Sequence, residues 1–216
     1  MALERIECES REAWLALRDR QGIGGSEAAA AVGKSPWQTP LELWRLKTGQ
    51  AVQKDLSGNA AVEQGNRLEP GLRAMFAADH PKLVVEYHQF DLLFQSERPW
   101  LFATLDGELT HSETGRRGIL EIKTATPGGR PGWDKWMGQV PQNYFIQICH
   151  QMLATGYDFA VLYAGLRHQN GDITLREYEF ERSEVAESAA WLLEQETRFY
   201  EEHIRKGVMP SMPLSL

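Results

Sequence analysis

The segment Leu101–Thr124, LFATLDGELTHSETGRRGILEIKT, constrains the fold more than any other part of the chain. A hydrophobic run ends in Asp106-Gly107, a pair that suits a hairpin turn, and a second strand-like run covers Gly118–Thr124. Apolar residues surround Glu121 in the second run, which indicates a central strand. The spacing therefore predicts two adjacent antiparallel strands, joined by a short polar connection, that bring Asp106 close to Glu121.

Side chains alternate between the two faces of a strand, so Glu121 and Lys123 are expected on the same face. Two carboxylates and a main-chain carbonyl are hard oxygen ligands of the kind that Mg²⁺ prefers. An ammonium group beside them can hold an attacking water and stabilise negative charge at phosphorus. The pattern is thus typical of metal-assisted phosphodiester hydrolysis. The alternative is an ion pair on a solvated sheet face, with no role in catalysis.

Length and composition suit one compact soluble protein, because 216 residues with 42% hydrophobic and 25% charged side chains can bury a sizeable core. The sequence contains no run of about eighteen apolar residues, so we expect no transmembrane helix. The N-terminal MALERIECES lacks the apolar core of a signal peptide. Cys8 and Cys149 show no paired spacing, so we expect reduced thiols in a cytoplasmic protein. The net charge of −7 argues against nucleic acid as a partner, but a DNA-cleaving enzyme needs only a local basic path beside an acidic metal site.

The first eighty residues are predicted to be mainly helical. Ser10 is expected to cap a helix to Arg20, and Ser26 to cap a helix over Glu27–Val32 after a glycine-rich turn. Such a turn presents free N–H groups, so it is either a phosphate site or an ordinary helix cap. Thr39-Pro40 opens the next helix, which extends to Lys47.

A longer helix is predicted over Asn59–Ala78, interrupted or kinked at Pro70-Gly71. Glu69 lies beside its apolar stripe and is either a functional acid or a solvated helix carboxylate. The stripe consists of Leu68, Leu72, Met75 and Phe76. Further strands are predicted at Leu83–Tyr87, Phe90–Phe94, Trp100–Leu105, Phe159–Leu166 and Ile173–Phe180, the last two as a hairpin.

The connection Thr126–Gln142 is too long for a simple turn and carries Trp133, Trp136 and Arg130. It either grips a nucleic-acid end by stacking or buries its tryptophans against a neighbouring element or subunit. The helix that follows, Asn143–Thr155, can present three side chains on one face, namely Tyr144, Gln147 and Gln151. A final amphipathic helix is predicted over Ser183–Lys206, followed by a proline-interrupted tail.

Taken in chain order, these features resemble the phage lambda exonuclease family, also called the YqaJ-like viral recombinase nucleases, of the PD-(D/E)XK nuclease superfamily. The resemblance covers roughly Trp14–Leu166. Its most specific pieces are GIGGSEAAAAVGKSPWQTPLELWRLKTG (Gly22–Gly49), LDG (Leu105–Gly107) and LEIKT (Leu120–Thr124).

The resemblance implies an α/β nuclease fold, with a central mixed β-sheet flanked by helices. It implies one nuclease domain over residues 1–216, with N-terminal helices in 1–80, a catalytic sheet core in 81–181 and a C-terminal helix and tail in 182–216. It also implies processive 5′-to-3′ digestion of one strand of linear double-stranded DNA. The cofactor would be Mg²⁺, for which Mn²⁺ can substitute, with two ions in each active site.

Known members form a ring-shaped homotrimer around DNA, and the 3′ overhangs that they leave suit a single-strand annealing protein as partner. The implied setting is a phage or prophage protein in the bacterial cytoplasm. The residues that match functional positions of the family are the metal-binding acids Asp106, Glu121 and Glu69, the Ile122 carbonyl, the catalytic Lys123, Gln147, and the 5′-phosphate group Arg18, Ser26 and Thr104. We expect further DNA contacts from Tyr144, Trp133, Trp136 and Arg130.

Two departures from the family pattern stand out. Thr104-Leu105 precedes Asp106 where the motif has proline, and Ala60-Ala61 stands where the family pattern leads us to look for a phosphate-contacting lysine. Arg67 or Lys34 is the expected replacement for that lysine. The competing interpretations are an endonuclease of the same superfamily, of restriction or CRISPR-associated type, and a DNA-binding module without catalysis.

Overall fold

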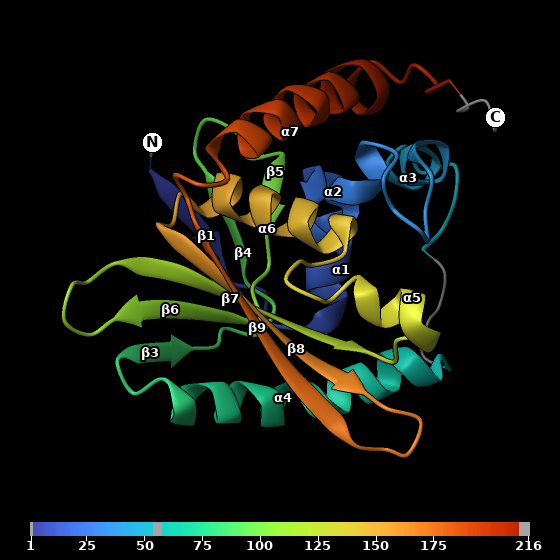
Figure 1. The fold of residues 1–216 in the computed structure, drawn as a ribbon. Coiled ribbons are helices and arrows are strands. Elements are labelled where there is room, and N and C mark those ends of the chain that lie inside the picture. The colour runs from blue at the N-terminus through green and yellow to red at the C-terminus, as the bar shows by residue number, and fades with distance from the viewer. Residues whose placement is uncertain (1, 54–57, 212–216) are drawn as a thin grey trace.

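The computed structural model describes residues 2–53 and 58–211 and contains two mixed β-sheets flanked by helices (Figure 1). The smaller, four-stranded sheet has the order β1 (Leu3–Ile6), β4 (Leu92–Gln95), β5 (Leu101–Ala103) and β2 (Ile23–Gly24). The larger, five-stranded sheet has the order β3 (Leu83–Glu86), β6 (Gly107–His111), β7 (Arg117–Ala125), β8 (Phe159–Arg167) and β9 (Ile173–Glu181). In the larger sheet only β7 and β8 pair in parallel.

The helices form layers around these sheets. They are α1 (Arg11–Gln21), α2 (Gly25–Ala31), α3 (Pro40–Lys47), α4 (Ala60–Asp79), α5 (Gly129–Asp134), α6 (Gln142–Thr155), α7 (Ala186–Arg198) and a π-helix η1 (Phe199–Arg205). Helix α4 lies on one side of the five-stranded sheet and α6 on the other, while α7 packs on the outer side of α6 (Figure 1). Among the described residues, no helix is both long and apolar enough to cross a bilayer.

Strand β7 is buried on both faces, and this places it at the centre of the protein. Ile119 faces the α6 layer, where it packs in one core cluster with Ile148 and Met152. Leu120 faces the α4 layer and packs with Phe76. The predicted strand with alternating faces is therefore confirmed, and the charged side chains of β7 lie between two packed layers.

The structure corrects the predicted turn at Asp106-Gly107. Strand β6 begins at Gly107 and continues to His111, so the connection to β7 consists of residues 112–116. The two strands are nevertheless adjacent and antiparallel, as predicted. Strands β1, β2 and β6 were not predicted, because the first two are short and β6 carries the polar sequence GELTH.

The helix starts are mostly as predicted. Ser10 caps α1, Thr39 caps α3 with Pro40 in its first turn, and Asn59 caps α4. The assignment of Ser26 as a cap is wrong, because α2 starts at Gly25 and the Glu27 carboxylate accepts a hydrogen bond from the Gly24 amide at 2.9 Å. A side-chain carboxylate here replaces the serine as the partner of a free helix-end donor.

Further expectations about the helices also need correction. Helix α4 continues through Pro70 without interruption, and Met75 is 48% exposed, so it does not belong to the buried stripe. The connection after β7 contains the short helix α5. The last helix starts at Ala186 and changes to π-helix at Phe199, and of the predicted tail only residues up to 211 lie within the described part.

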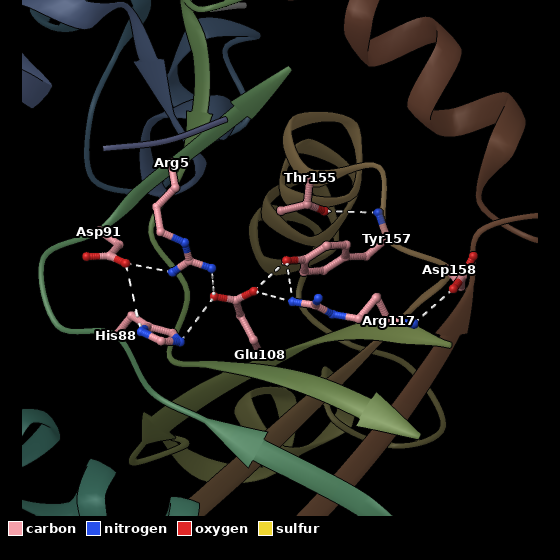
Figure 2. A network of polar contacts seen from close by, with 8 residues as sticks. All are labelled: Arg5, His88, Asp91, Glu108, Arg117, Thr155, Tyr157 and Asp158. Atoms are coloured by element: carbon pink, nitrogen blue, oxygen red, sulfur yellow. Dashed lines mark hydrogen bonds and ion pairs between the residues drawn. The ribbon is translucent and has the colours of Figure 1, made fainter. Parts of the chain in front are cut away.

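A polar cluster joins the two sheets around Glu108, on β6 (Figure 2). Its carboxylate, which is 3% exposed, accepts hydrogen bonds from Arg5 on β1, from Arg117 on β7 at 2.7 Å and from the Tyr157 hydroxyl. Arg5 also donates to Asp91 at 2.6 Å. The Glu108 cluster thus links the N-terminal strand and the loop before β4 to the larger sheet.

Candidate active site

Asp106 and Glu121 lie side by side at the junction of β6 and β7. The register pairs Gly107 with Leu120, so Asp106, one residue earlier, is opposite Glu121, one residue later. The main-chain amide of Ile122 donates to Asp106 Oδ2 at 2.7 Å and holds this carboxylate against β7. The predicted proximity of the two acids is therefore confirmed.

The Glu121 carboxylate is 2% exposed and is surrounded by donors. Lys123 Nζ contacts Oε1, and Gln147 Nε2 donates to the same atom at 2.6 Å. Gln151 Nε2 donates to Oε2 at 2.5 Å. Helical spacing predicted that both glutamines lie on one face of α6, but a functional role was predicted only for Gln147. The contact of Gln151 with Glu121 was not predicted.

Glu69 on α4 lies at the edge of the same site. Its carboxylate accepts a hydrogen bond from Arg73 at 2.5 Å, one helical turn further along. Arg73 Nε also donates to the main-chain oxygen of Asp106 at 2.6 Å, and its guanidinium lies 3.6 Å from the Tyr87 ring centroid. Arg73 therefore ties α4 to the start of β6, a positioning contact that the sequence analysis missed.

The electrostatics of this site are those of crowded acids. Burial and the charge of Glu121 raise the pKa of Asp106 well above its usual range. Burial also raises the pKa of Glu69, although Arg73 opposes this effect. For Lys123, burial disfavours the ammonium form, but the charges of Glu121 and Asp106 outweigh it and the pKa is raised. Lys123 is thus held as a cation.

The donor set fits a hard divalent cation. Within the described chain, no three or more His, Cys, Asp and Glu side chains form a metal cluster, so an ion here would need oxygen ligands besides the carboxylates, such as the Ile122 carbonyl beside Asp106 and Glu121. Oxygen ligands of this kind suit Mg²⁺. The pKa of Asp106 is raised first by burial and then by the charge of Glu121, and a bound cation would oppose both effects. Glu69 and these groups line one cavity of about 320 Å³.

The predicted 5′-phosphate group lines that same cavity. Arg18 donates to Ser26 Oγ at 3.0 Å, and Trp14 Nε1 donates to Thr104 Oγ1 at 3.0 Å. The Arg18 guanidinium also lies 4.6 Å from the centroid of the Trp14 ring, which orients it. One guanidinium and one hydroxyl from the neighbouring helices α1 and α2 thus line the cavity beside the acids, together with the hydroxyl of Thr104, which is distant in sequence.

Neither of the two suggested replacements for the missing lysine reaches this cavity. Lys34 lines a different cavity, between α6 and α7, and Arg67 is exposed on α4 outside the cavity lining. Both expectations are wrong for this arrangement. The Arg18 guanidinium is the cation that the structure places near the two hydroxyls.

The side chains that were predicted to contact DNA differ in exposure and in distance from the candidate active site. Trp136 is 4% exposed and packs against Tyr144 and Tyr178, so it is a core residue and cannot stack on DNA. Trp133 is half-buried against His168, and the side chain of Arg130 is 92% exposed. Tyr144 lies with its ring centroid 5.0 Å from Lys123 Nζ, next to the candidate catalytic groups.

Helix α2 approaches α6 closely at Gly25. A Cβ atom at this position would lie 3.2 Å from Cγ of Gln151 and 3.5 Å from Cγ of Gln147. A side chain at this position would be tight against Gln151, which would have to give by a few tenths of an ångström, so glycine favours the close packing of the two helices. The next residue, Ser26, belongs to the predicted 5′-phosphate group. The start of α2 therefore lines the cavity next to this group and also packs against the glutamines that contact Glu121.

Buried acids and a lysine on a central sheet strand, flanked by helices on both sides, define a protein of the PD-(D/E)XK nuclease fold. The chain belongs to the family of the YqaJ-like viral recombinase domain, whose model matches residues 13–158. It is 32% identical over 161 residues to the uncharacterized protein YqaJ of Bacillus subtilis. The matched region covers 72% of this chain and 47% of that relative. The chain thus spans about half the length of that curated relative.

Solved structures show the same fold. An alkaline exonuclease, LHK-Exo, from Laribacter hongkongensis superposes with a TM-score of 0.59 at 20% identity, over 91% of this chain and 97% of its own. A phage-related exonuclease from Haemophilus somnus 129PT gives a TM-score of 0.57 at 13% identity, over 88% and 97%. The predicted family and fold class are therefore confirmed, with the strands divided between two sheets.

Proposed function

We propose that this chain is a Mg²⁺-dependent exonuclease that digests one strand of linear double-stranded DNA processively from the 5′ end. The observation that carries the proposal is the convergence, in one cavity, of the acids and lysine with a separate group suited to a terminal phosphate. An endonuclease needs the first set but has no use for a pocket that recognises a strand end. The names of two relatives of this fold, an alkaline exonuclease and a phage-related exonuclease, support the same class.

Each side chain has a distinct part in this mechanism. Asp106, Glu121 and the Ile122 carbonyl would hold one Mg²⁺, and Asp106 with Glu69 a second. When bound, the ions supply a water of lowered pKa and positive charge at the phosphorus and the leaving oxygen. Lys123 holds the attacking water and stabilises the growing negative charge.

Other residues keep the reacting groups in register. Gln147 and Gln151 fix the Glu121 carboxylate, since each donates to it. Arg18, Ser26 and Thr104 hold the 5′-phosphate, and this sets the direction of digestion and the size of the product. A guanidinium is well suited to this task because it can donate two hydrogen bonds to one phosphate.

The wider setting follows the family. We propose that residues 1–216 act as one nuclease domain of a phage or prophage protein in the bacterial cytoplasm. A homotrimeric ring around the duplex would account for processive digestion. A single-strand annealing protein would take up the 3′ overhangs for recombination.

The decisive experiment uses linear duplexes labelled at one 5′ end or one 3′ end, with a covalently closed circle as control. With Mg²⁺, the 5′ label should be released first as a mononucleotide, and the circle should persist. EDTA should abolish release. Digestion of the circle would instead establish an endonuclease, and loss of the 3′ label first would reverse the polarity.

A second test addresses the phosphate pocket. Replacing the 5′-phosphate by a 5′-hydroxyl should slow wild-type digestion by about tenfold, the cost of losing a charged hydrogen-bonded contact. Arg18→Ala should remove most of this difference, because the guanidinium no longer distinguishes the two ends. An unchanged phosphate preference in Arg18→Ala would contradict the assignment.

A further inference from the structure

Trp37 is the most exposed aromatic side chain beside the candidate active site. It lies in the loop between α2 and α3 and is 71% exposed. Its ring centroid is 6.1 Å from that of Tyr144, which in turn lies 5.0 Å from Lys123 Nζ. Two aromatic rings thus lead from the lysine toward the solvent.

Hydrogen bonds shape the loop that carries Trp37. Ser35 Oγ accepts hydrogen bonds from the main-chain amides of Trp37, at 3.2 Å, and Gln38, at 3.3 Å. Immediately afterwards, Thr39 and Glu42 form a reciprocal cap at the start of α3. The exposed ring therefore projects from a turn that is hydrogen-bonded on the side of α3.

A second, larger cavity of about 940 Å³ lies in front of this ring. Trp37 lines it together with Arg45 of α3 and Asn66 of α4. It also shares Glu69, Ile122 and Lys123 with the cavity that holds the acids and the phosphate-side group. The two cavities therefore adjoin at the candidate catalytic residues, with Arg18 and Ser26 on one side and Trp37 on the other.

We propose that Trp37 is a stacking platform for the nucleobase on the 3′ side of the scissile phosphate. This inference rests on the proposed function. A strand with its 5′-phosphate near Arg18 passes the acids at its first internucleotide linkage and must continue into the second cavity. The second nucleotide then meets the face of the Trp37 ring, and Tyr144 supports that ring from the side of the active site.

The chemistry of this surface suits DNA of any sequence. Every base has a π-face, so stacking on an aromatic side chain holds a strand without reading it. Loss of one such contact weakens binding by about five- to 150-fold in single-strand binding proteins. Trp37 is therefore expected to keep the next linkage aligned after each nucleotide is released.

The test is a double-mutant cycle between the protein and its substrate. Single-turnover release of the first nucleotide is measured on 5′-phosphorylated duplexes in which the second nucleotide from that end is intact or abasic. Wild type, Trp37→Ala and Trp37→Phe are compared. The matched control is Trp191→Ala, which changes a 49% exposed tryptophan on α7, a helix on the outer side of α6.

In wild type, the abasic nucleotide should slow release by about tenfold, and Trp37→Ala should slow release from the intact duplex by a similar factor. In Trp37→Ala the abasic nucleotide should cause no further loss beyond its effect on base pairing, since the stacking partner is already absent. Trp37→Phe should restore most of the rate, and Trp191→Ala should match wild type. The cycle removes any effect on pairing, because pairing is altered equally for every protein variant.

Additive losses would overturn the inference, as would a change in particle mass of Trp37→Ala by light scattering, which would place Trp37 in a contact between copies. In both cases the wild-type protein would still digest the intact duplex, so the proposed function would stand. Failure of the wild-type protein to digest any duplex with Mg²⁺ would overturn the proposed function and this inference together.

Discussion

Two buried acidic centres lie at the start of strand β6, and their electrostatics are opposite. Although burial disfavours the charge on Glu108, the Tyr157 hydroxyl and the guanidiniums of Arg5 and Arg117 lower its pKa. For Asp106, two residues earlier, burial and the charges of Glu121 and Glu69 outweigh Lys123, and its pKa is raised well above the usual range. One centre is satisfied by the protein alone, and the other retains excess negative charge.

This difference suggests different roles: the Glu108 cluster stabilises the fold, and the acids around Asp106 suit a ligand. A buried carboxylate with several donors joins segments of the fold, as the Glu108 cluster does for the two sheets (Figure 2). Crowded carboxylates destabilise one another until a cation or proton arrives. The acids around Asp106 are therefore better explained by a ligand than by folding.

The largest effect is expected from Lys123→Ala. Cleavage of linear duplex should fall by about two orders of magnitude or more, because the group that holds the water is removed. Binding of the duplex, measured by fluorescence anisotropy with Ca²⁺ in place of Mg²⁺, should persist. Lys82→Ala, which changes an exposed surface lysine, is the control and should digest normally. Cleavage at the wild-type rate would remove Lys123 from the mechanism.

The two centres should respond oppositely to neutralisation. Glu108→Gln should lower the free energy of unfolding by about 2 kcal/mol, less than for a fully buried pair, because Arg5 and Arg117 reach solvent. Asp106→Asn should leave stability unchanged or raise it by about 1 kcal/mol, since one of two facing carboxylates loses its charge.

Urea denaturation at neutral pH measures both changes. Glu113→Gln, at a solvent-exposed ion pair with Lys82, is the control and should change stability by less than about 0.5 kcal/mol. Asp106→Asn should also abolish digestion, whereas Glu108→Gln should retain it. A large loss of stability in Asp106→Asn would show that the acids serve the fold.

A smaller effect is expected from Gln151→Met, which keeps the volume of the side chain but removes the donor to Glu121. Mn²⁺ binding, measured by calorimetry on the protein without DNA, should weaken by about tenfold, because the ligating carboxylate loses one of its supports. Gln139→Met, at an exposed position before α6, is the control. Equal Mn²⁺ affinity in the two variants would show that Gln151 does not position Glu121.

The smallest effect concerns pH. The folded-state pKa of Glu108 is lowered from the model-peptide value of 4.5, so its contribution to stability is present above that value and is lost as pH falls. The melting-temperature difference between wild type and Glu108→Gln should therefore shrink below about pH 4.5. The pKa of Asp106 is raised, so ionising this carboxyl costs stability as pH rises. The melting temperature of Asp106→Asn should therefore increase relative to that of wild type toward neutral pH. A difference independent of pH would contradict both assignments.

The proximity of the candidate catalytic acids could be predicted from sequence because their geometry is local. Strand alternation fixes Glu121 relative to Lys123, and antiparallel pairing across a short turn fixes Asp106 relative to both. Helical spacing likewise predicted that Gln147 and Gln151 share a face. What spacing could not give was the register of α6 against β7, which decides that both amides reach one carboxylate.

Features that depend on contacts between distant segments could not be predicted, because local spacing does not show which elements pack together. Glu108 looks like a surface residue of a polar strand until Arg5, 103 positions away, is placed beside it. Trp37 and Trp136 both lie in loop-like sequence rich in glycine and proline, yet one is 71% exposed and the other 4%. Local sequence contains no signal for that difference, because it arises from which elements close over each ring.

The contact between α2 and α6 at Gly25 has a mechanical consequence. The backbone of this turn packs against the two glutamines that donate to Glu121, and the same turn carries Ser26, which lines the cavity. Under the proposed function, a strand end that shifts the turn on docking would therefore also press on the side chains that hold Glu121. Recognition of the terminus and support of the proposed metal ligand would then be coupled through this one contact.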